Sequence, residues 1–139
     1  MANIFGKKLK KEELARYSGN YGHIVGINQM KCMEGKAKGA DVLDFKTGAG
    51  LEFRVALDKC MDLLTLSYKG VTLSQMTKNG QTANFSGLPI KGNFFKSING
   101  GMMYTCGLLN VGPDCFDADG NYHPFHGQII VSCHSSYVG

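Results

Sequence analysis

The stretch from Ile98 to Gly127 holds the residues whose types and spacing are best suited to binding chemistry. Glycines interrupt its apolar first half, and a polar loop then leads to a Pro-Phe-His-Gly turn that contains His126. Glycine lets the backbone approach a ligand closely or take a positive φ. A histidine beside such a turn offers a hydrogen-bond donor or acceptor near neutral pH. The combination predicts a binding cleft rather than a plain core strand.

Metal binding is a weaker interpretation of the same stretch. Zinc sites usually show tight paired spacings such as Cys-x2-Cys. The available ligands here are irregularly spaced: Cys106, Cys115, His123, His126, Cys133 and His134. Asp114, Asp117 and Asp119 with Gly120 resemble a calcium loop, but the glutamate that such a loop needs is missing. We therefore predict a turn rich in Asp and Gly at this point, and no metal site.

Positive charge is concentrated at the N-terminus, which argues against a nucleic-acid partner. The formal net charge is +4, from 15 basic and 11 acidic residues. Four of the basic residues are Lys7, Lys8, Lys10 and Lys11, and 15 − 4 leaves 11 basic against 11 acidic residues. Because the remainder is neutral, the sequence has no broad basic surface for nucleic acid.

Composition predicts a single cytoplasmic domain spanning residues 1–139. This length is enough for one domain with a hydrophobic core. No apolar run reaches the roughly 18 residues that cross a bilayer, and no secretory signal is visible, so we expect no membrane partner. The five cysteines are odd in number and irregular in spacing. This pattern does not indicate a disulfide framework, and a reducing cytoplasm is the simplest location.

Alternation of apolar and polar residues predicts β-hairpins in the first half of the chain. Apolar residues at every second position from Leu51 to Leu57 predict a half-buried strand, which pairs with a strand over Val42–Lys46. Leu64–Tyr68 and Val71–Leu73 form a second hairpin around a Lys-Gly turn. His23–Met30 is predicted as a further strand.

The remaining elements are a short helix, a long loop and further strands. A helix is predicted over Lys10–Tyr17, where charged residues form a favourable i,i+4 pair. Thr77–Gly92 is predicted as a loop, and loops of that length are often functional. Asn93–Ile98 is a turn of helix or strand, and Met102–Leu109 and Gly127–Cys133 are strands. The fold class is therefore all-β: an antiparallel β-sandwich with a short N-terminal helix.

Three stretches of the sequence carry a family resemblance. They run from Gly48 to Asp62 with the following Tyr68-Lys-Gly70, from Asn93 through Met102 and Thr105 to Gly112, and from Asp119 to Gly127. On these residues the chain resembles the N-terminal part of the aldose 1-epimerase-like proteins of the galactose mutarotase-like superfamily. More narrowly, it is similar to an uncharacterised branch of that superfamily known as a domain of unknown function.

The resemblance implies both a fold and a chemistry. The family's fold is a large β-sandwich, usually about twice this length or more, so residues 1–139 are expected to be its N-terminal portion. Its enzymes interconvert the anomers of a small sugar. A carboxylate removes the proton of the anomeric hydroxyl while a histidine protonates the ring oxygen, and the ring opens and closes again. No metal or organic cofactor is required.

The resemblance also implies the site residues. His126 matches the histidine of the family's His-Gly motif, which contacts the sugar oxygens, and it is the predicted catalytic residue. Asn110 and Asp62 lie in family-like motifs and are predicted to bind substrate. Arg54, on the polar side of its strand, is predicted to contact a hydroxyl or carboxylate group. His123 is a further predicted substrate-binding residue, with an extended loop histidine before a proline as its alternative.

Two departures from the family pattern shape the predicted function. The family's second histidine and catalytic glutamate lie further along the chain than Gly139. Lys59-Cys60 stands where related chains prefer Arg-Gly, so the turn lacks its glycine. We therefore predict a carbohydrate-binding, aldose 1-epimerase-like protein that lacks its general base and is catalytically incomplete as given. The alternative is a non-catalytic interaction module or homo-oligomer that pairs through an exposed sheet edge.

Overall fold

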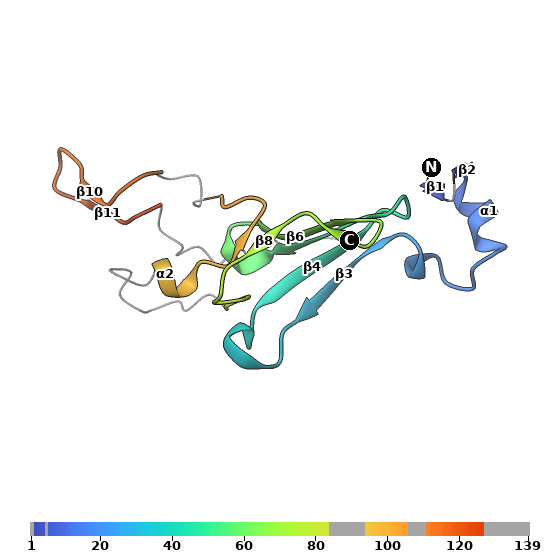
Figure 1. Cartoon of the computed structure of the whole chain (residues 1–139), viewed down its shortest axis with the longest axis horizontal. Coiled ribbons are helices and arrows are strands. Elements are labelled where there is room, and N and C mark those ends of the chain that lie inside the picture. The colour runs from blue at the N-terminus through green and yellow to red at the C-terminus, as the bar shows by residue number, and fades with distance from the viewer. Residues whose placement is uncertain (1, 5, 84–93, 106–110, 127–139) are drawn as a thin grey trace.

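A five-stranded antiparallel sheet is the centre of the structure, a computed structural model that describes residues 2–4, 6–83, 94–105 and 111–126. The strand order is β3-β4-β5-β6-β7. The five strands are β3 (Gly26–Lys31), β4 (Asp41–Lys46), β5 (Leu51–Ala56), β6 (Asp62–Tyr68) and β7 (Val71–Thr72). The sheet lies between an N-terminal arm at one end and the hairpin β10–β11 (Cys115–Phe116 and Tyr122–His123) at the other (Figure 1).

The other elements are short and lie around the sheet. The arm holds β1 (Ala2–Ile4), β2 (Lys7–Leu9), α1 (Lys11–Ala15) and the 3-10 turn η1 (Tyr21–His23). Two further 3-10 turns are η2 (Gly35–Ala37) and η3 (Leu57–Lys59), and the second half adds β8 (Gln75–Met76), α2 (Phe94–Ser97) and β9 (Gly100–Gly101). In the described ranges no helix has the length and apolar character needed to cross a membrane. The predicted all-β, antiparallel fold class is confirmed, and the arrangement is consistent with a sandwich-like fold.

Both predicted hairpins are present. β4 pairs with β5 so that Phe45 faces Phe53, and their rings stack with centroids 4.4 Å apart. β6 turns into β7 with Tyr68 opposite Val71. Between β5 and β6 the register shifts at Arg54/Val55, which marks a β-bulge. Strands therefore form where apolar and polar residues alternate in the sequence, as predicted.

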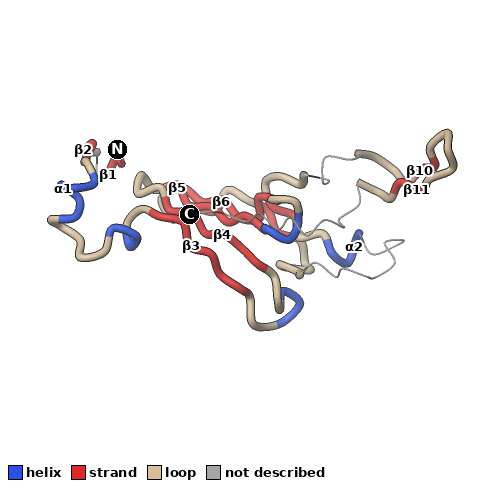
Figure 2. Tube along the Cα trace, turned by 180° about the vertical axis from the view of Figure 1, so that it is seen from behind, coloured by secondary structure: helices blue, strands red, loops and turns tan. Residues whose placement is uncertain are grey.

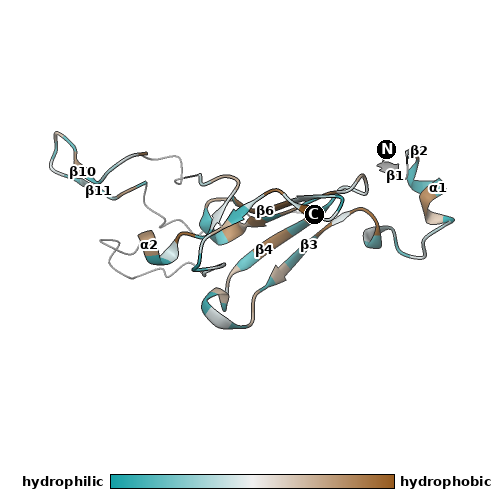
Figure 3. Cartoon of the chain, in the orientation of Figure 1, coloured by the Kyte–Doolittle hydropathy of each residue, from teal (hydrophilic) through white to brown (hydrophobic). Residues whose placement is uncertain are grey.

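The alternation gives the sheet one apolar face and one mostly polar face. Hydrophobic and hydrophilic residues are mixed along β3 and β4, as side chains that point in opposite directions require (Figure 3). By their register the apolar face comprises Ile27, Leu43, Phe45, Leu51, Phe53, Val55, Leu63, Leu66 and Tyr68. The small buried core lies on the other face, where Val42, Ala56 and Leu64 pack together. Cys32 packs against this core and accepts a hydrogen bond from Gln81 Nε2 at 3.3 Å.

The predicted strand over His23–Met30 is wrong in its first residues. His23 belongs to the 3-10 turn η1, and the strand begins only at Gly26. The Asn20 side chain accepts the Gly22 N–H at 2.9 Å and caps this turn. Such side-chain to backbone bonds compete with strand pairing. The predicted helix exists as the shorter α1, and Tyr17 lies beyond it with 82% of its surface exposed.

The predicted buried strand over Met102–Leu109 is wrong where the structure describes it. Only Gly100 and Gly101 form a strand, β9, and their φ angles are +80° and +106°. These left-handed angles break an extended run. Met102 and Met103 are therefore about half exposed, and Met103 makes a single bridge to Leu63. Residues 106–109 and the predicted strand Gly127–Cys133 lie outside the described residues, as do residues 84–92 of the predicted loop.

Candidate functional site

The turn between η3 and β6 directs two charged side chains into the protein. Cys60 and Met61 both take left-handed backbone angles, with φ of 53° and 66°. The Met61 N–H donates to the Ala56 carbonyl at 3.1 Å and closes the turn. On either side of this reversal, Lys59 is only 3% exposed and Asp62 only 4%. The turn thus forms with a cysteine, not a glycine, at the left-handed position 60.

We predict that Cys60→Gly stabilises the protein by about 1 kcal/mol, because glycine takes φ near +53° without the steric cost that a Cβ incurs. Urea denaturation of wild type and variant measures the gain. Cys60→Ala removes the same thiol but keeps a Cβ, so it should bring no gain. Equal stability of the glycine and alanine variants would show that the turn carries no strain.

Asp62 holds the segment that contains Tyr104 and Thr105. One of its carboxylate oxygens, Oδ1, accepts the Thr105 N–H at 2.7 Å and lies 2.9 Å from the Thr105 hydroxyl, which is also 2.8 Å from the Cys60 carbonyl. Burial raises the pKa of Asp62, and the two Thr105 contacts and nearby Lys59 oppose that rise. Asp62 therefore positions this segment against the end of β6.

Lys59 holds the end of α2. Its Nζ donates to Thr82 Oγ1 at 2.5 Å, to the Ser97 carbonyl at 2.8 Å and to Asn99 Oδ1 at 3.2 Å. An ammonium group has three protons, and each has an acceptor here. Burial lowers the pKa of Lys59 to about 8, against the opposing charges of Asp58 and Asp62. The C-terminal end of α2 is thus tied to the turn before β6.

An aromatic frame forms where the two segments that Lys59 and Asp62 hold meet the segment of Phe125 and His126. Phe94 of α2 lies edge-on to Tyr104, with ring centroids 5.7 Å apart. Phe125 packs against Phe94 at 4.8 Å. The His126 ring lies 4.1 Å from that of Phe125, 5.3 Å from Phe94 and 6.5 Å from Tyr104. Three segments of the chain, which contribute Phe94, Tyr104 and Phe125, therefore meet around one histidine.

His126 is held in one orientation by Gly112. The His126 N–H donates to the Gly112 carbonyl at 3.0 Å, and the Gly112 N–H donates to His126 Nδ1 at 3.2 Å. Because Nδ1 accepts a hydrogen bond, the neutral ring carries its proton on Nε2. His126 also has a φ of +54°, an angle that a non-glycine residue keeps only where its surroundings impose it. The half-buried ring thus presents a fixed Nε2–H donor.

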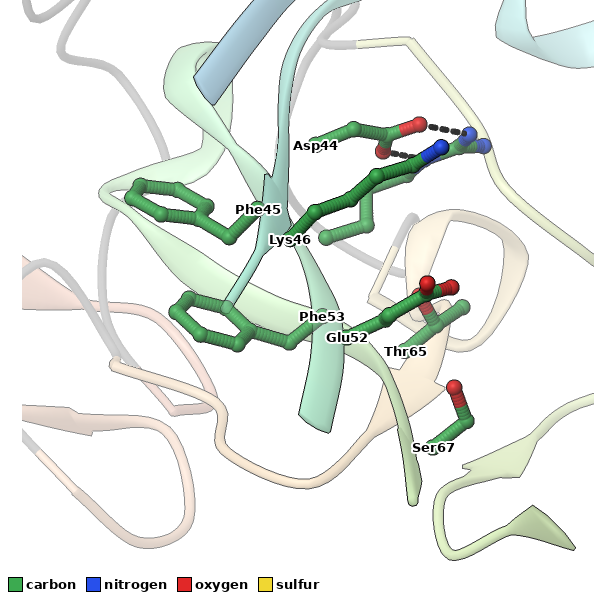
Figure 4. A pocket seen from close by; sticks show the side chains of 8 residues that line it. Asp44, Phe45, Lys46, Glu52, Phe53, Thr65 and Ser67 are labelled. Carbon is green, nitrogen blue, oxygen red and sulfur yellow. Dashed lines mark hydrogen bonds and ion pairs between the residues drawn. The ribbon is translucent and has the colours of Figure 1, made fainter. Parts of the chain in front are cut away.

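Arg54 lies elsewhere, on the polar face of the sheet. Its Nε and one terminal nitrogen bind both oxygens of Asp44, at 2.5 and 2.8 Å, which raises the pKa of Arg54. The pair borders an open hollow of about 190 Å³ with Lys46, Glu52, Thr65 and Ser67. Figure 4 shows the rings of Phe45 and Phe53 pointing away from these polar groups.

His123 lies on the hairpin β10–β11, where it contacts Asp117 rather than the aromatic frame. Its Nε2 is 3.0 Å from Asp117 Oδ2. The same carboxylate accepts the backbone N–H groups of Asp119 and Asn121, at 3.0 and 2.8 Å. Together with His123, these contacts hold the pKa of Asp117 well below its usual range. The predicted turn rich in Asp and Gly is confirmed, with Asp117 accepting the hydrogen bonds that close it.

The structure therefore brings together only part of the predicted site. Asp62 supports the aromatic frame around His126, whereas Arg54 and His123 have their own carboxylate partners. Asn110 lies outside the described residues. Lys59, Thr82, Asn99 and Thr105 were not predicted, because their contacts join positions up to 45 residues apart. In the described part of the chain, no three His, Cys, Asp or Glu side chains gather as metal ligands would.

Comparison with known proteins identifies the family of the chain, but no individual similar protein. The family model described as "Domain of unknown function (DUF4432)" matches residues 37–135, which is more than two thirds of the chain. The match covers the sheet from β4 onward, the turn with Lys59 and Asp62, and His126. No curated protein and no solved structure gives a significant match.

Proposed function

Since the chain belongs to the DUF4432 family, a domain of unknown function, we propose that it is a carbohydrate-binding, aldose 1-epimerase-like protein in which His126 contacts a small sugar. The observation that carries this proposal is the fixed Nε2–H of His126 inside an aromatic frame. Sugar sites combine a few oriented polar groups with apolar surface. The frame offers both, and the three motif stretches of the sequence support the same interpretation.

The chemistry of the frame suits a pyranose. A neutral imidazole with its proton on Nε2 donates a hydrogen bond to a ring oxygen or hydroxyl oxygen of the sugar. The C–H face of the sugar packs on an aromatic ring next to it. Phe95 is the accessible ring, with 71% of its surface exposed, and it lies 5.8 Å from Phe125. The proposed sugar spans His126 and the ring of Phe95.

The proposal covers binding rather than turnover. Opening the sugar ring needs a carboxylate base on the opposite side of the bond from the acid. Asp62, a predicted polar cleft residue that holds the segment of Tyr104, is 4% exposed and binds Thr105, so we assign it a positioning role. We expect anomer exchange at the uncatalysed rate when the chain is added to a freshly dissolved aldose. Exchange NMR measures this, and a clear acceleration would show that a base is present.

Two exposed phenylalanines offer a matched test of the sugar site. Phe95→Ala should weaken aldose binding by about tenfold, since the stacking surface is lost. Phe116 is equally exposed at 71% but lies on the hairpin β10–β11, so Phe116→Ala should leave binding unchanged. His126→Phe keeps an aromatic ring and removes the donor, and should abolish binding. Calorimetric titration with a panel of aldoses measures all three. Equal effects of the two alanine variants would refute the proposed site.

A second function is favoured by β3, which forms an edge of the five-stranded sheet. All of its residues after Gly26 are exposed, and an exposed edge can pair with another chain. We infer that β3 is such an interaction edge, with a homo-oligomer as one form. Hydrogen exchange in complexes isolated from the source cells tests it. Pairing should slow exchange at Ile27, Gln29 and Lys31, and unprotected exchange there in every complex would disprove this function.

We place both functions in the cytoplasm. Among the described cysteines, Cys32 and Cys115 are free thiols, in keeping with a reducing compartment. Fractionation of the source cells tests the location, and recovery of the protein outside the cytoplasmic fraction would contradict it.

A further inference from the structure

The hydrogen-bonding direction of each β3 residue follows from the register. Cys32, just beyond β3, donates its N–H to the carbonyl of Ala40, the residue before β4, at 2.9 Å. Pairing alternates along an antiparallel ladder, so Met30, Asn28 and Gly26 also direct their backbone groups toward β4. The N–H and C=O groups of Ile27, Gln29 and Lys31 therefore point away from the sheet. No described residue is hydrogen-bonded to these outward backbone groups.

This edge lacks the features that usually prevent pairing. β3 contains no proline and no bulge, and its register with β4 is regular over six residues. Its only charged residue is Lys31, whose ammonium binds Asp41 Oδ2 at 2.9 Å. Both views of the chain show β3 along the outside of the sheet (Figures 1 and 2). The edge is thus open, regular and nearly neutral.

We propose that the partner of this edge is a second copy of the chain, paired antiparallel through β3 with Gln29 opposite Gln29 of the second copy. The inference rests on the second proposed function, pairing through the β3 edge. Three outward-pointing residues lie symmetrically about Gln29. A two-fold arrangement centred there places Ile27 opposite Lys31 of the other copy, and it pairs every outward backbone group of both copies.

The proposed register also avoids conflicts between side chains. Lys31 meets Ile27 rather than another lysine, and its charge is already balanced by Asp41. On the other face of the strand, Asn28 meets Met30 of the second copy. Ile27 is 60% exposed and Met30 40%, so pairing removes part of both apolar side chains from water. Because an edge contact is small, the dimer should be concentration-dependent rather than permanent.

Charged substitutions of Gln29, which lies on the proposed symmetry axis, test the register. Wild type should form a dimer reversibly in sedimentation velocity experiments over a range of concentrations. Gln29→Lys alone and Gln29→Glu alone each place like charges opposite each other, and each should weaken the dimer by about tenfold or more. An equal mixture of the two variants places opposite charges on the axis and should restore the dimer. Asn28→Lys is the matched control, because its lysine meets Met30, and it should keep the dimer.

Each other outcome overturns the proposal in a recognisable way. A wild type that stays monomeric at all concentrations excludes the second copy as partner, while the exchange measurement on cellular complexes still decides whether β3 pairs with a different chain. A dimer that persists in both Gln29 variants lies on another surface, and then slowed exchange at Ile27, Gln29 and Lys31 would be absent as well. Dissociation by Asn28→Lys instead of Gln29→Lys would disprove the register.

Discussion

Gly101→Ala is expected to lower the free energy of unfolding by at least about 3 kcal/mol, because the added Cβ has no space. A Cβ built at Gly101 would lie 2.3 Å from the Leu63 carbonyl oxygen and 3.0 Å from that of Leu64. Both are backbone atoms of β6, so neither can rotate away. The φ of +106° adds a conformational cost.

Gly39→Ala is the matched control for this substitution. Its φ of +90° is similar, but a Cβ there would meet nothing within 4 Å. We expect it to cost only about 1 kcal/mol, the price of a left-handed angle alone. Urea denaturation of both variants separates the two contributions. Equal losses in the two variants would mean that β9 does not lie against β6 as closely as the structure shows.

Lys59 should make the protein more stable as the pH rises through the alkaline range. Burial lowers its pKa from 10.5 in the unfolded chain to about 8 in the folded protein. The folded state therefore binds fewer protons between these values, and stability rises with pH there. The contribution is fully present above about pH 10.5 and is lost as the pH falls through about 8. The difference in pKa corresponds to about 3 kcal/mol.

The measurement is the free energy of unfolding of wild type and Lys59→Met at several pH values from 7 upward. Other groups titrate in the same range, but they cancel in the difference between the two proteins. Lys96→Met, which replaces an exposed lysine of α2, is the control and should follow wild type. A difference that does not change with pH would show that the Lys59 ammonium is not held in the buried network.

The central hairpins could be predicted because their signal is local. Alternation from Leu51 to Leu57 gives β5 one apolar face, and the pairing with β4 follows from a short connection. The errors have equally local causes. Asn20 caps η1 and delays the start of β3, and the positive φ angles of Gly100 and Gly101 shorten the strand predicted after them. Neither the cap nor the angles change the pattern of apolar residues from which strands are predicted.

The candidate site was harder to predict because its contacts are not local. His126 was found from its motif, and the hairpin register alone would have placed Asp44 opposite Arg54. The burial of Lys59 gave no signal in the sequence, since its acceptors Thr82 and Asn99 lie 23 and 40 residues away. The expectation of a glycine in place of Cys60 pointed to the turn that the left-handed angles of Cys60 and Met61 form. It did not reveal that the turn directs Lys59 and Asp62 toward the segments around His126.

The nitrogen resonances of the His126 ring, followed during titration with a panel of aldoses, test the central claim most directly. We predict that the free protein shows the proton on Nε2, and that one aldose shifts the Nε2 signal in a saturable way while Phe116→Ala behaves as wild type. A proton on Nδ1 would contradict the orientation set by Gly112. An Nε2 signal that no aldose moves, even at about 100 mM, far above a millimolar Kd, would contradict the proposed sugar site.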